Sequence, residues 1–126
     1  MNLPENILYT KEHEWIRVEE GVAFAGITAF AQGELGDIVF IEIETVGEIL
    51  DSGEVFGTVE AVKTVSDLFM PVSGEILEMN SKLENQPELI NNDPYGDGWM
   101  IKIKISNPDE LKHLMDAASY KAMLEA

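Results

Sequence analysis

Short apolar runs separated by glycine are the feature that most restricts how this chain can fold. Glycine stands at positions 21, 33, 36, 47, 53, 57 and 74, which suits tight turns and bulges between short elements. Six runs are rich in apolar and β-branched residues: 22–27, 38–43, 55–62, 66–70, 72–79 and 99–105. In the last run Trp99, Ile101 and Ile103 alternate with other residues, as a strand buried on one face requires. The pattern predicts a mostly β fold.

Two helices are expected beside these strands. Thr28 is a good N-cap for a short helix over 28–35, which Gly36 can end in the left-handed conformation. Asn107 and Pro108 begin an amphipathic helix over 107–118, and residues 120–124 add a final turn. The segment 84–98 is rich in proline, glycine, Asn and Asp, so we expect an ordered loop there.

The length of 126 residues predicts one domain, with a core over about 9–106 and a C-terminal helical segment over 107–126. We expect a flattened barrel or sandwich of two antiparallel sheets with the C-terminal helix on the outside. Three large aromatic residues are expected to anchor the core: Trp15, Phe40 and Trp99.

Charge and cysteine content restrict the function. The chain has 24 acidic and 8 basic residues, a net charge of −16, and no cysteine. Such a charge argues against binding nucleic acid or anionic lipid, and favours protein partners with basic surfaces. Without cysteine, any covalent or redox chemistry needs an added group. The first ten residues carry no targeting signal and no apolar run could span a membrane, so a cytoplasmic protein is expected, although a mature mitochondrial protein also fits.

Lys63 is the one Lys or Arg between Arg17 and Lys82. Two β-prone arms flank it, and the sequence Gly-Glu-Ile-Leu at 47–50 recurs at 74–77, so the repeat brackets the lysine. We therefore expect Lys63 at the exposed tip of a hairpin, where a modifying enzyme can reach its amine. Isolation alone would leave it a solvated turn lysine.

The run Glu60–Asp67, followed by Pro71–Glu75, resembles the lipoyl-lysine hairpin of the biotinyl/lipoyl carrier superfamily. More narrowly, the chain resembles the H-protein family of the glycine cleavage system. The further matching stretches are 9–15, 26–28, 31–32, 35–40, 87–91 and 93–99. Ala61 and Thr64 depart from the family, whose members often carry Ser and Ala there.

The resemblance implies a monomeric, non-catalytic carrier with lipoate in amide linkage on Lys63. It implies that the arm takes the aminomethyl group of glycine from a pyridoxal-phosphate-dependent glycine decarboxylase to a tetrahydrofolate-dependent aminomethyltransferase. Dihydrolipoamide dehydrogenase then reoxidises the arm, and a lipoate-attaching enzyme installs it. Each partner supplies catalysis and this chain supplies transport.

The resemblance also implies site residues besides the lysine. Glu14 and Asp67 are candidates to line a cleft for the loaded arm, with His13 and Glu12 as further candidates. Recognition by the lipoate-attaching enzyme is assigned to Glu60, Val62 and Ser66. From the residues alone, these acids are equally consistent with solvated surface charges. No metal site is expected, because His13 and His113 have no ligand pattern near them and the acidic residues at 93–97 do not fit a calcium loop.

Other readings remain open from the residues. The chain could donate lipoyl groups to other proteins in a relay, or be another lipoyl or biotinyl carrier domain, although biotin carriers flank the lysine with methionine and here Val62 and Thr64 flank it. A Schiff-base lysine enzyme would need phosphate-binding glycines at a helix start, which are not visible. A purely structural β-module would leave the lone lysine unexplained.

Overall fold

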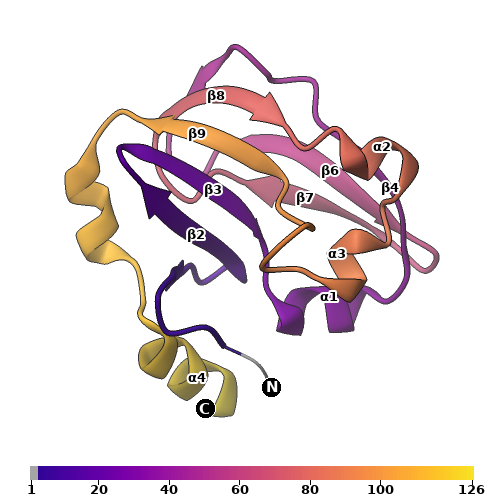
Figure 1. Cartoon of the computed structure of the whole chain (residues 1–126). Coiled ribbons are helices and arrows are strands. Elements are labelled where there is room, and N and C mark those ends of the chain that lie inside the picture. The colour runs from indigo at the N-terminus through magenta and orange to yellow at the C-terminus, as the bar shows by residue number, and fades with distance from the viewer. Residues whose placement is uncertain (1–2) are drawn as a thin grey trace.

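A computed structural model describes residues 3–126 as two antiparallel sheets with helices at their edges and at the C-terminus (Figure 1). The six-stranded sheet has the order β1 (Leu8–Tyr9), β2 (Glu14–Glu19), β3 (Val22–Ile27), β9 (Ile101–Ile105), β8 (Gly74–Met79) and β5 (Ile49–Leu50). The three-stranded sheet has the order β4 (Ile38–Glu42), β6 (Val55–Ala61) and β7 (Val65–Phe69). The predicted fold class is confirmed, as two separate sheets rather than a closed barrel.

One core lies between the two sheets. Alternate residues of each strand point into it, so that Ala23 and Ile103 of the larger sheet share a cluster with Val59 of the smaller one. All six predicted strands are confirmed to within a few residues, as β3, β4, β6, β7, β8 and β9. The sequence pattern missed β1, β2 and β5, of which two are only two residues long and β2 carries charges at both ends.

Phe40 does not anchor the core, so this prediction is wrong. The register between β4 and β6 shifts between Ile38 and Phe40, which leaves one extra residue on β4. Such a bulge turns two consecutive side chains to the same side of a sheet. Val39 and Phe40 therefore both face outward, and Phe40 is 52% exposed.

Trp15 and Trp99, the other two predicted core anchors, differ in how deeply they are buried. Trp15 is fully buried, as predicted, but in a second cluster with Ile7, Tyr9 and Tyr120. Trp99 lies outside β9 and packs against Phe24 at the edge of this cluster, with the ring planes at 90°. Met100 takes the buried position instead.

The predicted short helix is confirmed as α1 (Ala29–Leu35). The Thr28 hydroxyl accepts a hydrogen bond from the Ala31 amide at 3.2 Å, and Gly36 ends the helix with φ of 82°. The expected loop at 84–98 instead contains two helical turns, α2 (Lys82–Asn85) and α3 (Leu89–Asn92). Each turn buries one apolar side chain, Leu83 or Ile90, which explains why the backbone coils there.

The continuous helix predicted over 107–118 is wrong. A 3-10 helix (Pro108–His113) begins at the Asn107 cap, and the chain then becomes extended at Leu114. Met115 and Tyr9 exchange backbone hydrogen bonds of 2.8 and 2.9 Å, which a continuous helix would not allow. Asp116 caps a new helix, α4 (Ala117–Glu125), by accepting from the Ser119 amide.

Stacked aromatic rings attach α4 to the N-terminal strands. The rings of Tyr9 and Tyr120 lie 4.7 Å apart and almost parallel. In Figure 1 α4 lies at the lower left, whereas the β6–β7 turn projects at the right, on the side of α1, α2 and α3. No helix among residues 3–126 is long and apolar enough to cross a membrane.

Candidate functional site

Lys63 lies in the turn between β6 and β7, so the hairpin prediction is confirmed. The turn is closed by a hydrogen bond from the Ala61 amide to the Thr64 carbonyl at 2.8 Å. Val62, Lys63 and Thr64 are all exposed. The two copies of the repeat, which bracket this hairpin in sequence, pair with each other, since β5 lies antiparallel to the start of β8.

The lysine turn rests on the segment Gly36–Asp37, which we call the ledge. The Val62 amide donates to the Asp37 carbonyl at 3.0 Å. A Cβ atom placed on Gly36 would come within 3.2 Å of Lys63 Cε, so the lysine side chain lies directly over this glycine. With φ of 82°, position 36 also favours glycine for its backbone alone. Sequence analysis identified Gly36 only as a helix end and missed this contact.

The outer face of the smaller sheet surrounds the lysine turn with apolar and acidic side chains. Phe40, Glu60 and Val65 form one row across the three strands. Glu42, Thr58 and Asp67 form the parallel row further from the turn. Of the three residues that the resemblance assigned to enzyme recognition, Glu60 and Val62 are exposed on the β6 side of Lys63, whereas Ser66 is half-buried on the β7 side, opposite Val59.

Glu14 is a buried carboxyl group that links the two sheets. It lies at the start of β2, is only 4% exposed, and its Oε2 atom accepts a hydrogen bond from the Phe69 amide of β7 at 2.7 Å. Its Oε1 atom is buried and has no hydrogen-bond partner among residues 3–126. Burial raises the pKa of Glu14 to about 8, the charge of Glu12 adds to this, and the Phe69 amide opposes it. Glu14 is therefore a proton-holding group with one free oxygen.

Asp67 lies on the same strand as the hydrogen-bond partner of Glu14. It is exposed and stands two residues nearer to the lysine turn than Phe69, about 7 Å along β7. The lysine turn, Asp67 and the Phe69 amide that Glu14 binds therefore follow one another along the chain. All three lie at the β7 edge of the smaller sheet, where Asp67 is exposed and Glu14 is buried.

His13 and Glu12 are held elsewhere. His13 Nδ1 lies 2.8 Å from the Tyr120 hydroxyl, and the His13 ring packs on Phe30. The same hydroxyl lies 2.8 Å from Thr28 Oγ1, so His13 connects α4 to the start of α1. Glu12 is exposed and lines a pocket of about 230 Å³ with residues of the C-terminal segment, including His113 and Met115.

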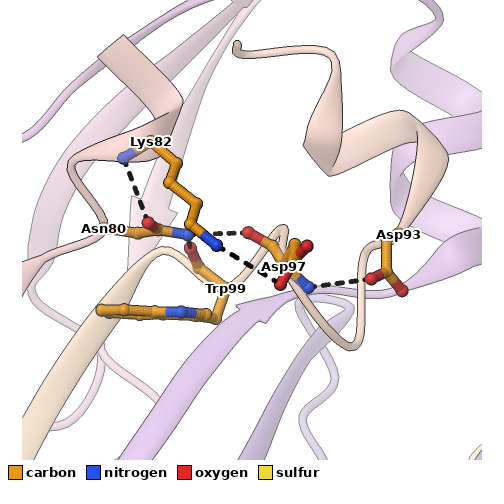
Figure 2. Close-up of polar contacts among 5 residues, drawn as sticks. All are labelled: Asn80, Lys82, Asp93, Asp97 and Trp99. Atoms are coloured by element: carbon orange, nitrogen blue, oxygen red, sulfur yellow. Dashed lines mark hydrogen bonds and ion pairs between the residues drawn. The ribbon is translucent and has the colours of Figure 1, made fainter. Parts of the chain in front are cut away.

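The acidic loop at 93–97 supports its own turn. The Asp93 carboxylate accepts from the Asp97 amide at 2.9 Å, and the Asp97 carboxylate lies 3.7 Å from Lys82 Nζ, as Figure 2 shows. Within residues 3–126 no three His, Asp or Glu side chains are grouped as metal ligands.

Residues 7–126 match the family model described as Glycine cleavage H-protein. The chain is 60% identical to the glycine cleavage system H protein of Bacteroides fragilis over 126 residues, with 100% of each chain covered. It is 58% identical to that of Symbiobacterium thermophilum over 121 residues, covering 96% of this chain and 94% of the relative.

A solved structure agrees with the sequence matches. The crystal structure of a glycine cleavage system H protein from Mycobacterium marinum superposes with a TM-score of 0.90 at 37% identity, covering 98% of this chain and 100% of the other. The matches extend over the lysine hairpin, the ledge and α4 together. The chain therefore belongs to the glycine cleavage H-protein family, the lipoyl carriers of the glycine cleavage system.

Proposed function

We propose that Lys63 is the residue of this carrier to which lipoate is attached through an amide bond. The observation that carries the proposal is the position of Lys63, at an exposed hairpin tip with its side chain over a glycine. The missing side chain at Gly36 leaves room along the lysine, and the exposed turn leaves its amine open to a second protein. Lys63 is also the one base in an acidic stretch, so an approaching enzyme meets a single amine there.

Once attached, lipoate supplies dithiolane sulfurs on which the aminomethyl group of glycine is carried between enzymes. This chain presents the arm at the hairpin tip and leaves the chemistry to its partners, so we propose that it is not itself catalytic. We further propose that residues 9–106 and the C-terminal segment act as one carrier domain, which the core shared by the two sheets supports.

Glu14 and Asp67 are proposed to shelter the loaded end of the arm. A carried amine is cationic, and a buried carboxyl group with a free oxygen can accept a hydrogen bond from it while losing its own proton. Asp67 adds an exposed carboxylate nearer to the lysine. His13 and Glu12 are weaker candidates, because their contacts lie with α4 and the C-terminal segment.

The shelter is tested by the rate at which the loaded carbon is lost as formaldehyde. Glu14→Ala should raise this rate several-fold, because water reaches the site and the carboxylate no longer holds the amine. Asp67→Asn should raise it less. An unchanged rate in Glu14→Ala contradicts the shelter and leaves the assignment of Lys63 intact.

The proposed partners are the glycine decarboxylase, the aminomethyltransferase, dihydrolipoamide dehydrogenase and a lipoate-attaching enzyme. They would dock on the surface formed by Val39, Phe40, Glu60, Val62 and Val65, which we call the hairpin face. Its exposed apolar centre and acidic edge suit a partner with an apolar contact inside a basic rim. Ser66 is half-buried, so we expect it to contribute less to docking.

A charge of −16 opposes self-association, so we propose a monomer. A cytoplasmic location accords with the bacterial origin of the relatives.

The attachment site is tested by intact mass after incubation with lipoate, ATP and a lipoate-attaching enzyme. The unaltered chain should gain one lipoyl group and Lys63→Arg should gain none. Lys82→Arg is the matched control, because Lys82 is also exposed and lies outside the hairpin, at the start of α2. A lipoyl group on Lys63→Arg, or no gain in the unaltered chain with an active enzyme, overturns the proposal.

A further inference from the structure

Asn91 makes an unusual set of hydrogen bonds from α3. Its Oδ1 atom accepts from the Ile38 amide at 2.9 Å. Its Nδ2 atom donates to Gln32 Oε1 and to the Gly36 carbonyl, both at 2.9 Å. One side chain therefore joins the last turn of α1, the ledge and the first residue of β4, and both amide hydrogens are used.

The groups that Asn91 holds belong to the two peptide groups that flank the Asp37 Cα atom. The Gly36 carbonyl is part of the first peptide group and the Ile38 amide is part of the second, whose carbonyl accepts from Val62 in the lysine turn. Gly36 itself lies under the Lys63 side chain. Asn91 is thus separated from Lys63 by one short segment of backbone, although it does not touch the lysine.

Packing alone does not fix this segment. No residue of α1 is fully buried, and Asp37 is exposed. Glycine at position 36 has many backbone conformations in the unfolded chain, so holding it at a φ of 82° costs conformational entropy. The three hydrogen bonds of the half-buried Asn91 side chain therefore stabilise one conformation of the ledge.

We propose that Asn91 is a positioning residue for the modification of Lys63, acting through the ledge. The proposal rests on the assignment of Lys63 as the attachment site. In the modification, the neutral Lys63 amine attacks the carboxyl carbon of lipoate activated as a mixed anhydride. The C–N amide bond forms, the activating group leaves, and the amine proton passes to solvent. A ledge that holds Val62 and the lysine stem favours the position of the amine from which it can approach the face of the activated carboxyl group.

Asn80 provides a matched control, because it makes the same kind of clamp away from the lysine. Its Nδ2 atom donates to the carbonyls of Asp97 and Trp99 at 2.7 and 2.8 Å, and its Oδ1 atom accepts from the Lys82 amide (Figure 2). Asn80→Leu therefore removes three hydrogen bonds, as Asn91→Leu does. In the part of the chain that the structure describes, the segment that Asn80 holds makes no backbone hydrogen bond to the lysine turn.

The experiment measures kcat and KM of a lipoate-attaching enzyme with each full-length carrier variant as substrate, followed by intact mass. Asn91→Leu should lower kcat about tenfold with KM changed less than about twofold, since the hairpin face is retained. Asn80→Leu should leave both constants near those of the unaltered chain. Amide hydrogen exchange of Val62 gives a readout that is independent of the enzyme, and it should be faster in Asn91→Leu only.

Two further variants keep the proposal falsifiable if Asn91→Leu does not fold. Asn91→Asp keeps an acceptor for the Ile38 amide, but it loses both donors and places a carboxylate oxygen against the Gly36 carbonyl, so it should also lower kcat. Gly36→Ala disturbs the ledge directly, because its Cβ would press on Lys63 Cε at a φ that favours glycine, and it should reproduce the loss in kcat.

The outcomes separate the two proposals. If the unaltered chain is not modified at Lys63, the attachment site is wrong. If it is modified, and Asn91→Asp and Gly36→Ala match its kcat and its Val62 exchange, the positioning role of Asn91 is wrong and the attachment site remains. A loss of kcat in Asn80→Leu equal to that in Asn91→Leu also overturns the role, because general destabilisation would then explain both.

Discussion

The lysine end and the aromatic end of this molecule are held together in opposite ways. At the lysine end, large apolar side chains are exposed, with Phe40 at 52% and Val62 at 72%, and hydrogen bonds between backbone groups fix the turn. At the aromatic end, Tyr9, Trp15 and Tyr120 are fully buried and their rings pack together. Burial of aromatic area stabilises a fold strongly, whereas exposed apolar area is available to a partner.

From this contrast we expect that the aromatic end mainly stabilises the fold and that the lysine end mainly contacts partners. Glu14 connects the aromatic end to the lysine end. It stands next to Trp15 in sequence, yet its carboxyl group bonds to β7 of the lysine hairpin. A change in the aromatic end should therefore alter stability alone, a change in the hairpin face should alter partner rates alone, and a change at Glu14 should be felt by both.

Tyr120→Ala should have the largest effect on stability. It removes the ring that stacks on Tyr9, the hydroxyl that meets His13 and Thr28, and a large buried volume. A buried aromatic residue changed to Ala typically costs about 3–5 kcal/mol. Urea unfolding followed by tryptophan fluorescence measures the loss, and the two ends are separable if the folded variant keeps the lipoylation rate of the unaltered chain.

Tyr120→Phe is the matched control, because it keeps the ring and removes only the hydroxyl. It should cost about 1–3 kcal/mol, since the Thr28 hydroxyl is left buried without this partner. If Tyr120→Ala slows lipoylation at a temperature where it is fully folded, the two ends are coupled and the comparison fails.

Glu14→Gln should change how stability depends on pH. Because the pKa of Glu14 is raised to about 8 in the folded chain, from 4.5 when unfolded, the folded state holds the proton more tightly. The protonated Glu14 carboxyl group contributes its full stabilisation below pH 4.5, the pKa of Glu14 in the unfolded chain. This contribution to the free energy of unfolding falls as the pH rises toward 8, by at most about 1.4 kcal/mol per pH unit. The variant lacks this proton, so the unaltered chain should lose stability relative to Glu14→Gln between pH 5 and 8.

The measurement is the difference between the two free energies of unfolding at each pH, which cancels the titration of all other groups. If this difference stays constant with pH, the pKa of Glu14 is the same in the folded and unfolded chains. The burial of Glu14 between the two sheets would then make no pH-dependent contribution to stability.

Elements with a regular pattern could be predicted from the sequence. The alternation in residues 101–105 gave β9, and the Thr28 and Gly36 signals gave both ends of α1, because these depend on local backbone preferences. The isolated charge and the flanking repeat indicated the position of Lys63 at a hairpin tip. The lipoyl function came from the resemblance, because a lone lysine on a hairpin has no chemistry of its own.

Features that depend on distant contacts could not be predicted. Phe40 points outward because of a bulge against β6, and one extra residue in a strand leaves no mark on composition. The break at Leu114 depends on Met115 pairing with Tyr9, more than one hundred residues away. The hydrogen bonds of Asn91 could not be predicted for the same reason, because its three partners lie 53 to 59 positions earlier in the chain.

Phe40→Ala tests the lysine end and should have a moderate effect. The side chain is exposed, so its loss should change the free energy of unfolding by less than about 0.5 kcal/mol. If the hairpin face docks partners, kcat/KM of the lipoate-attaching enzyme should fall several-fold, because the apolar contact is lost. Leu77→Ala is the control, since Leu77 is also an exposed apolar residue but lies on β8 of the other sheet. Equal losses in the two variants would show that the hairpin face has no special part in docking.

Glu60→Gln should have the smallest effect and tests the acidic edge of the same face. Glu60 lies between Phe40 and Val65 and has no ion-pair partner among the described residues, so its charge is free to attract a basic rim. Rim charges act mainly on association rate and are screened by salt. At low ionic strength the variant should lower kcat/KM by less than about twofold, and the two chains should become equal as salt is raised. If kcat/KM of the variant stays lower at high salt, Glu60 makes a direct contact in the docked complex. The hairpin face would then be recognised through short-range contacts and not through long-range electrostatic attraction.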